Sequence, residues 1–180
     1  MYGGYENWKL ELDSPIFSTP VVVPASSHNG SDLLVANVKG VIHKINLATR
    51  KIMWILDTKM HIFAPLTVLE MKLVCAMSRE GQVHAIDIDQ SAIKWSLTME
   101  KPVNAGICLV SKQNAIVLDN RASYKLIRSI DGFELSRGSL QIGETFSTPL
   151  KSSKNHLLIG SRDDNVYCFN IEQNVLVSDE

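Results

Sequence analysis

Three arginines in a shared sequence setting are the residues best suited to bind a ligand. Arg79, Arg121 and Arg162 each lie in or beside a predicted hairpin turn and recur about every 41 residues. A guanidinium group binds carboxylates and phosphates in a bidentate manner. The three side chains could therefore line one rim of the fold and bind an anionic group. The alternative is that each arginine belongs to an ordinary solvated turn.

The cysteines and histidines lack the spacing of a metal or redox site. Cys75, Cys108 and Cys168 lie far apart in apolar runs without a CxxC pair, so we expect three buried, reduced thiols. His43 and His84 occur at matching places, 41 residues apart, which puts them on different structural units. No glycine-rich phosphate loop, GxSxG or HExxH motif occurs. We expect no catalytic residue, no cofactor and no metal.

Composition excludes two classes of partner. The chain of 180 residues has 18 Lys and Arg against 19 Asp and Glu, a net charge of −1, which argues against binding nucleic acid. No apolar run of about 18 residues is present, so we expect no membrane span. The first residues have neither a basic region nor an apolar one, unlike a signal peptide. These features favour a cytoplasmic location.

An internal repeat dictates which elements carry these residues. Trp54 and Trp95 are 41 residues apart, and so are Gly40 and Gly81. Each unit of 41 to 45 residues contains four short apolar stretches and no helical periodicity. Such a period is typical of β-propellers, in which each blade is a four-stranded antiparallel sheet.

Two local features support propeller blades. Strands two and three of each unit meet at a tight turn that favours residues with positive φ, namely at Lys39-Gly40, Glu80-Gly81, Arg121-Ala122 and Asp163-Asp164. Strand two is apolar on both faces, as in 73–76, so it must be covered on both faces by neighbouring sheets. We predict an all-β fold of about four blades.

The repeat also defines the organisation of the chain. Trp8 stands at the place of Trp54, so residues 1–12 are interpreted as the end of a preceding blade, which makes the propeller incomplete at its N-terminus. An open arc should expose apolar residues of strand two at both ends, around 33–36 and 157–159, and so require either missing blades or self-association. The predicted blades are 13–56, 57–98, 99–138 and 139–180.

The recurring segment resembles the pyrroloquinoline-quinone-like (PQQ-like) repeat of quinoprotein alcohol dehydrogenase-like propellers, Ala-x-Asp-x-x-Thr-Gly-x-x-x-Trp. Residues 85–95 match at Ala85, Asp87 and Trp95. The resemblance implies that the tryptophan docks between adjacent blades, while an aspartate such as Asp87 usually caps the following turn. The residues to which we assign a structural role are Trp8, Trp54, Trp95, Asp87, Gly40, Gly81, Gly132, Pro20, Pro65 and Pro149.

The resemblance extends to function. Quinoprotein dehydrogenases use adjacent cysteines, which this chain lacks. The chain is more similar to the C-terminal propeller of the β-alanine-activating branch of the acyl-CoA synthetase family, which also has an adenylation domain and a phosphopantetheine carrier domain. That similarity implies a non-catalytic interaction module of an ATP-dependent acid–thiol ligase, whose partner is a protein or the carrier domain of the same parent chain. The alternatives are a fragment of a PQQ-dependent dehydrogenase and an outer-membrane assembly-type scaffold.

Overall fold

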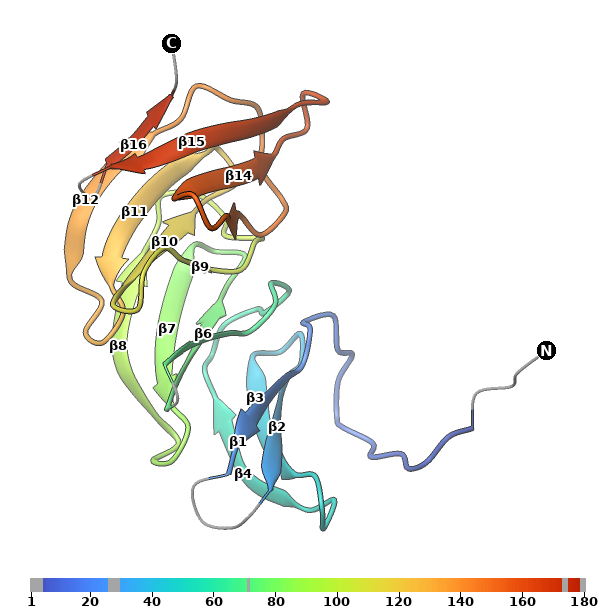
Figure 1. Cartoon of the computed structure of the whole chain (residues 1–180). Coiled ribbons are helices and arrows are strands. Elements are labelled where there is room, and N and C mark those ends of the chain that lie inside the picture. The colour runs from blue at the N-terminus through green and yellow to red at the C-terminus, as the bar shows by residue number, and fades with distance from the viewer. Residues whose placement is uncertain (1–4, 26–29, 71, 173–174, 179–180) are drawn as a thin grey trace.

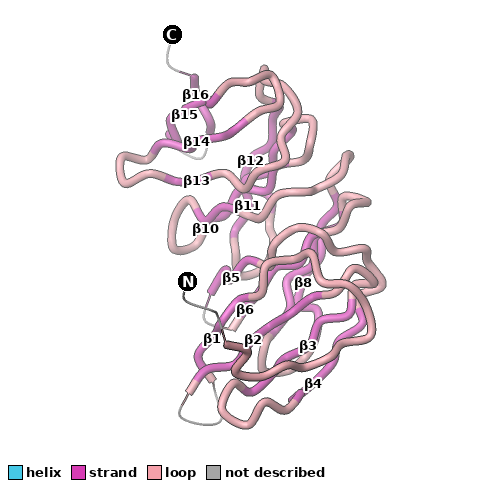
Figure 2. The backbone as a smooth tube through the Cα atoms, turned by 90° about the vertical axis from the view of Figure 1, so that its right-hand side faces the viewer, coloured by secondary structure: helices cyan, strands magenta, loops and turns pink. Residues whose placement is uncertain are grey.

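The chain folds into four antiparallel sheets in a row. The computed structural model describes residues 5–25, 30–70, 72–172 and 175–178. Within this described part there are sixteen strands and no helix, and therefore no helix that could cross a membrane. Each sheet contains four strands in chain order, so the predicted all-β propeller blades are confirmed (Figures 1 and 2).

The strands divide evenly among four blades. Blades 1 and 2 consist of β1 (Val21–Pro24), β2 (Ser31–Ala36), β3 (Val41–Asn46), β4 (Ile52–Asp57), β5 (Thr67–Glu70), β6 (Leu73–Met77), β7 (Gln82–Asp87) and β8 (Ala92–Thr98). Blades 3 and 4 consist of β9 (Cys108–Leu109), β10 (Asn114–Leu118), β11 (Ser123–Arg128), β12 (Glu134–Ser139), β13 (Leu150–Lys151), β14 (His156–Gly160), β15 (Val166–Glu172) and β16 (Val175–Ser178).

The turn between the second and third strands has the same geometry in every blade. Its last residue has a positive φ in all four copies: Gly40 at 82°, Gly81 at 86°, Ala122 at 61° and Asp164 at 67°. In blade 1 the Oδ1 atom of Asn37 accepts hydrogen bonds from the amides of Lys39 and Val41, both at 3.1 Å. Ser78 and Asp119 cap the same turn in blades 2 and 3.

Apolar clusters fill the three spaces between consecutive blades. In β6, Val74 and Ala76 belong to the cluster shared with blade 1, whereas Cys75 and Met77 belong to the cluster shared with blade 3. The second strand of blade 2 is therefore covered on both faces, as its composition predicts. Burial of these faces supplies most of the stabilisation of the arc.

A backbone hydrogen bond ties each hairpin turn to the loop that precedes its own blade. The amide donors lie in the turn between the second and third strands, and the carbonyl acceptors lie in the loop before the first strand. The pairs are Val38 to Pro15 (2.9 Å), Arg79 to His61 (3.2 Å), Asn120 to Pro102 (2.8 Å) and Arg162 to Glu144 (2.9 Å). These bonds place the turns and the preceding loops on one common rim.

Gly40 should not tolerate a side chain. A Cβ atom added there would lie 2.0 Å from the carbonyl oxygen of Met60, and the residue already has a positive φ. We expect Gly40→Ala to lower the free energy of unfolding by about 3 kcal/mol, from backbone strain and overpacking together. Gly30→Ala is the control for overpacking, because Gly30 also has a positive φ, of 143°, but an added Cβ there meets nothing within 4 Å. Equal losses in urea denaturation would rule out the steric explanation.

One expectation about the ends of the arc is corrected. Residues 5–20, which include Trp8, contain no strand, and the assignment of residues 1–12 to the end of a preceding blade stays a prediction. The expected exposure of 33–36 and 157–159 is wrong for Leu34, Ala36, Leu157 and Ile159. These side chains point inward, toward the neighbouring blade, and the exposed apolar residues at the ends are others, such as Val22 and Val166.

Candidate functional site

The repeated tryptophans lie between blades. Trp95 is 9% exposed and belongs to the cluster between blades 2 and 3. Its Nε1 atom donates to the carbonyl oxygen of Ser129 at 3.1 Å, and Trp54 donates in the same way to Ile88 at 3.0 Å. In both cases the acceptor belongs to the next blade. A Cβ added at Gly132 would lie 2.7 Å from the Trp95 ring, so the glycine provides the space for it.

Asp87 caps a turn. Its Oδ1 atom accepts hydrogen bonds from the amides of Asp89 at 2.9 Å and Gln90 at 2.8 Å. Burial opposes ionisation, but these bonds and Lys94 hold the pKa of Asp87 below its usual value. Asn46 has the equivalent role in blade 1 and accepts from the amide of Thr49 at 2.7 Å. The Asp87 carboxylate therefore has a structural role in capping this turn.

The prolines precede the innermost strands. In blades 1 and 4 the proline comes immediately before the first strand, as Pro20 and Pro149. In blade 2 one residue separates Pro65 from β5, and in blade 3 Gly106 takes the place of the proline. The amide of Gly106 donates to the Oγ1 atom of Thr148 at 2.8 Å, and a Cβ added at Gly106 would lie 3.2 Å from the Pro65 ring. The inner ends of blades 2, 3 and 4 therefore converge here, where the small residue allows close approach.

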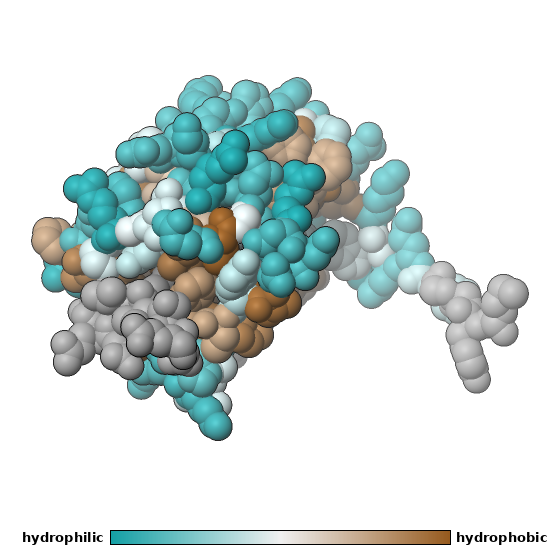
Figure 3. Space-filling model, turned by 90° about the horizontal axis from the view of Figure 1, so that it is seen from above, coloured by the Kyte–Doolittle hydropathy of each residue, from teal (hydrophilic) through white to brown (hydrophobic). Residues whose placement is uncertain are grey.

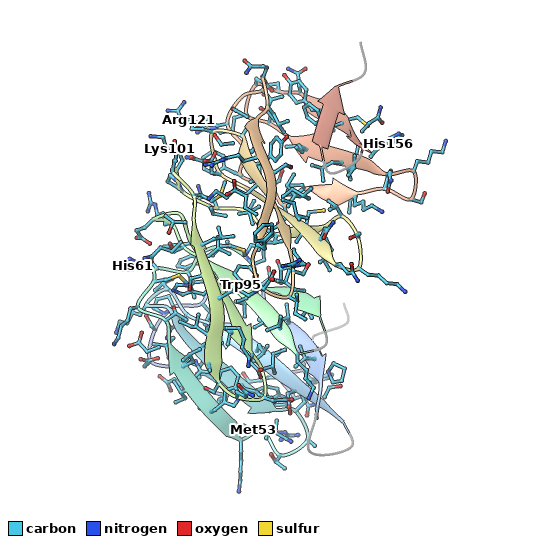
Figure 4. The ribbon with its side chains drawn as sticks, turned by 90° about the vertical axis from the view of Figure 1, so that its left-hand side faces the viewer. Met53, His61, Trp95, Lys101, Arg121 and His156 are labelled. Carbon is cyan, nitrogen blue, oxygen red and sulfur yellow. The ribbon has the colours of Figure 1, made fainter. Side chains whose placement is uncertain are left out.

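The predicted arginines lie on the rim formed by the hairpin turns. Arg121 and Arg162 both approach Glu144, with N–O distances of 3.6 and 3.1 Å. Arg79 instead stacks on Phe63, with its guanidinium carbon 6.0 Å from the ring centroid. Figure 4 shows Arg121 on the same side of the ribbon as His61 and Lys101, with Trp95 in the interior. The structure thus brings two arginines together and leaves the third with an aromatic partner.

Phenylalanines complete this rim, and the sequence reasoning did not assign them a binding role. The Phe17 and Phe63 rings are 5.8 Å apart, and Arg162 stacks on Phe146 at 5.4 Å. All three rings are exposed. The signal in the sequence is the segment Phe-Ser-Thr-Pro, which occurs at residues 17–20 and again at 146–149. We define the binding rim as Phe17, Phe63, Phe146, Arg79, Arg121, Arg162 and Glu144.

A shallow hollow adjoins the binding rim on blade 4. Its volume is about 400 Å³, and Phe146, Arg162 and Asp164 are among the residues that line it. Nearby, the Asp163 carboxylate accepts from the Tyr167 hydroxyl at 2.8 Å, and this bond, together with those from Ser161 and the amides of Gly143 and Asn165, lowers the pKa of Asp163 to about 2. The carboxylate is therefore ionised at neutral pH, and the rim presents charges of both signs.

The cysteines fall into two groups. Cys75 and Cys108 are buried, and burial raises the pKa of both thiols. The expectation that Cys168 is buried is wrong, because its side chain lies exposed on the outer face of blade 4. Across the described residues, no group of His, Cys, Asp and Glu side chains is arranged to hold a metal ion.

Comparison with known proteins identifies the family. A family profile described as outer membrane protein assembly factor BamB, built on PQQ-type repeats, matches residues 2–177. The chain belongs to this BamB-like family of repeat propellers. No curated protein sequence matches the chain. The residues that carry the family pattern are those that pack between blades and cap turns.

Solved structures show the same fold. BamB from Moraxella catarrhalis superposes with a TM-score of 0.76 at 13% identity, covering 94% of this chain and 54% of that one. The computationally designed Ika4 protein gives 0.75 at 17% identity, covering 94% of this chain and 100% of Ika4. The designed Ika8 protein gives 0.68 at 16% identity, covering 86% and 47%. This BamB-like chain thus spans about half the length of the BamB that it resembles.

Proposed function

We propose that this BamB-like propeller is a non-catalytic scaffold that binds a protein through the binding rim. The observation that carries the proposal is the exposed stacking of arginine on phenylalanine in blades 2 and 4. Aromatic and arginine side chains dominate the energetics of protein interfaces, because they bury large areas and still donate hydrogen bonds. Their exposure here leaves that capacity available to a partner.

Charge on the rim favours a partner segment that combines apolar and acidic side chains. Among the described carboxylates, none forms an ion pair with Arg79, whereas Arg121 and Arg162 share Glu144. An incoming carboxylate would gain a bidentate contact with Arg79 while an apolar neighbour packs on Phe17 and Phe63. This pattern matches a protein segment better than it matches a small metabolite.

The parent protein is a separate proposal. From the resemblance of the repeats we propose an acyl-CoA synthetase-type parent in the cytoplasm, an ATP-dependent acid–thiol ligase whose carrier domain would occupy the rim. The family match favours an assembly scaffold of the BamB kind instead. The encoded sequence upstream of Met1 discriminates the two: an adenylation motif with a carrier serine supports the first, and a signal sequence with a lipobox cysteine supports the second.

Site-specific photo-crosslinking in the native cell tests the rim proposal. A benzophenone amino acid replaces Phe63 in one variant and Phe133 in the other. Phe133 is the matched control, because it is exposed and lies under Arg128 at 5.2 Å, but belongs to the turn before β12. We expect a discrete crosslinked protein from position 63, lost in the Arg79→Glu background, and none from position 133. Equal crosslinking from both positions would contradict the proposal.

A further inference from the structure

The outer face of blade 4 presents apolar residues that every other blade covers. Val166 pairs with the last residue of β14 and is 77% exposed. The residues that make the same pairing in the other blades are at most 7% exposed, because the next blade packs on them: Ile42, Val83 and Tyr124. Val166 therefore occupies a blade-to-blade interface that lacks its second side.

Neighbouring positions on this face are likewise exposed in blade 4 and buried in the other blades. Cys168 is exposed and pairs with Leu158, while Leu158 pairs with the exposed Leu150 on β13. The counterparts of Cys168 are all buried between blades: Lys44, Ala85 and Leu126. Figure 3 looks onto this end of the molecule and shows apolar atoms among polar ones.

Blade 1, at the opposite end of the arc, exposes the face that in the other blades packs against the preceding blade. Val22 lies on the side of β1 that faces away from blade 2 and is 58% exposed. Ile16 is also exposed, whereas its counterparts Ile62 and Val103 are buried against a preceding blade. Residues 5–15 extend to one side of blade 1 toward the N-terminus (Figure 1), and the Asn37 side chain donates to Asp13 at 2.9 Å.

We propose that a second copy of this chain occupies both faces, so that two four-bladed arcs close into one ring. The blade 4 face of each copy packs on the blade 1 face of the other, which repeats the three interfaces inside the chain. Head-to-tail contacts of this kind form a ring when the rotation closes. Two observations favour a ring of two copies. The four blades match about half of the BamB chain (54%), so two copies supply about as many blades as one BamB. The four blades also match the whole of the designed Ika4 chain, which is therefore a separate chain of the same extent.

Sedimentation of the purified chain, combined with the reactivity of Cys168, tests the proposal. Between about 1 and 100 µM protein, we expect the mass to rise from one chain to two and no further. The reaction of Cys168 with a thiol reagent should slow by about tenfold over this range, because the dimer buries it. Cys75 and Cys108 are buried in both states and provide the internal reference.

Variants identify the faces. Val166→Asp and Val22→Asp should each remain monomeric at about 100 µM with Cys168 reactive, while mixing the two should restore part of the association, because one intact interface remains. Ile130→Asp is the control, since Ile130 is 60% exposed but lies in the turn before β12. A monomer at all concentrations, open polymers, or a dimer that survives either face variant would overturn the proposal. None of these outcomes affects the binding rim, which crosslinking tests separately.

Discussion

Trp95→Ala should lower the free energy of unfolding by about 3–5 kcal/mol. The ring fills the cluster between blades 2 and 3, and its Nε1 atom bonds to Ser129 of the next blade. Removing it leaves a cavity against Gly132 and an unsatisfied carbonyl. For a chain of this length the melting temperature should fall by about 10 °C, measured by circular dichroism.

Two further variants make this result specific. Ile93→Ala, in the same strand but exposed, should change stability by less than about 0.5 kcal/mol. Trp54→Ala should lie between the two, because Trp54 is half-buried although it makes the equivalent bond. A Trp95→Ala chain as stable as the wild type but defective in partner binding would overturn the structural role of the repeat tryptophans.

Lys44→Met should cost about 3–5 kcal/mol of stability, because it removes one charge from a buried ion pair. The Nζ atom of Lys44 lies 3.1 Å from Asp32 and 3.5 Å from the carbonyl oxygen of Ile88, and both charged side chains are buried. The pair thus lies at the contact between blades 1 and 2. Urea denaturation of the variant measures the loss.

The double variant Lys44→Met/Asp32→Asn should recover part of that stability, since no buried charge then remains in the pair. Lys94→Met is the control, because its pair with Asp87 (3.3 Å) is partly exposed and should contribute less than about 1 kcal/mol. If Lys44→Met and Lys94→Met lose equal stability, the ion pair between the blades is not a significant contributor.

The architecture could be predicted from the sequence because the same pattern of strands and turns occurs in four copies. The apolar second strands and the positions with positive φ each recur in register, so an error in one copy is corrected by the others. Ala122 and Asp164 adopt the same φ region as Gly40 and Gly81, which composition alone would not indicate. Trp8 shows the limit of the repeat, because it matches Trp54 in the pattern but lies in a segment that forms no strand.

The proposed binding rim is only half predictable from the sequence. The arginines were identified by their position in the turns, but the sequence could not show that Arg79 stacks on Phe63 rather than pairing with a carboxylate. Phe63 lies in the loop before β5 and Arg79 in the turn after β6. The distance between the two side chains depends on the path of that loop along the rim, which the sequence does not specify. The exposure of Cys168 was missed for a related reason, since an apolar run indicates burial only where a next blade exists.

Titration with the quinone cofactor distinguishes the proposed scaffold from a quinone enzyme. Pyrroloquinoline quinone with calcium is added to the chain while the fluorescence of the tryptophans is followed. We expect no saturable change up to about 100 µM ligand, because the repeat residues are engaged in packing and capping. Saturable binding in the micromolar range would contradict it and would assign the propeller to redox chemistry.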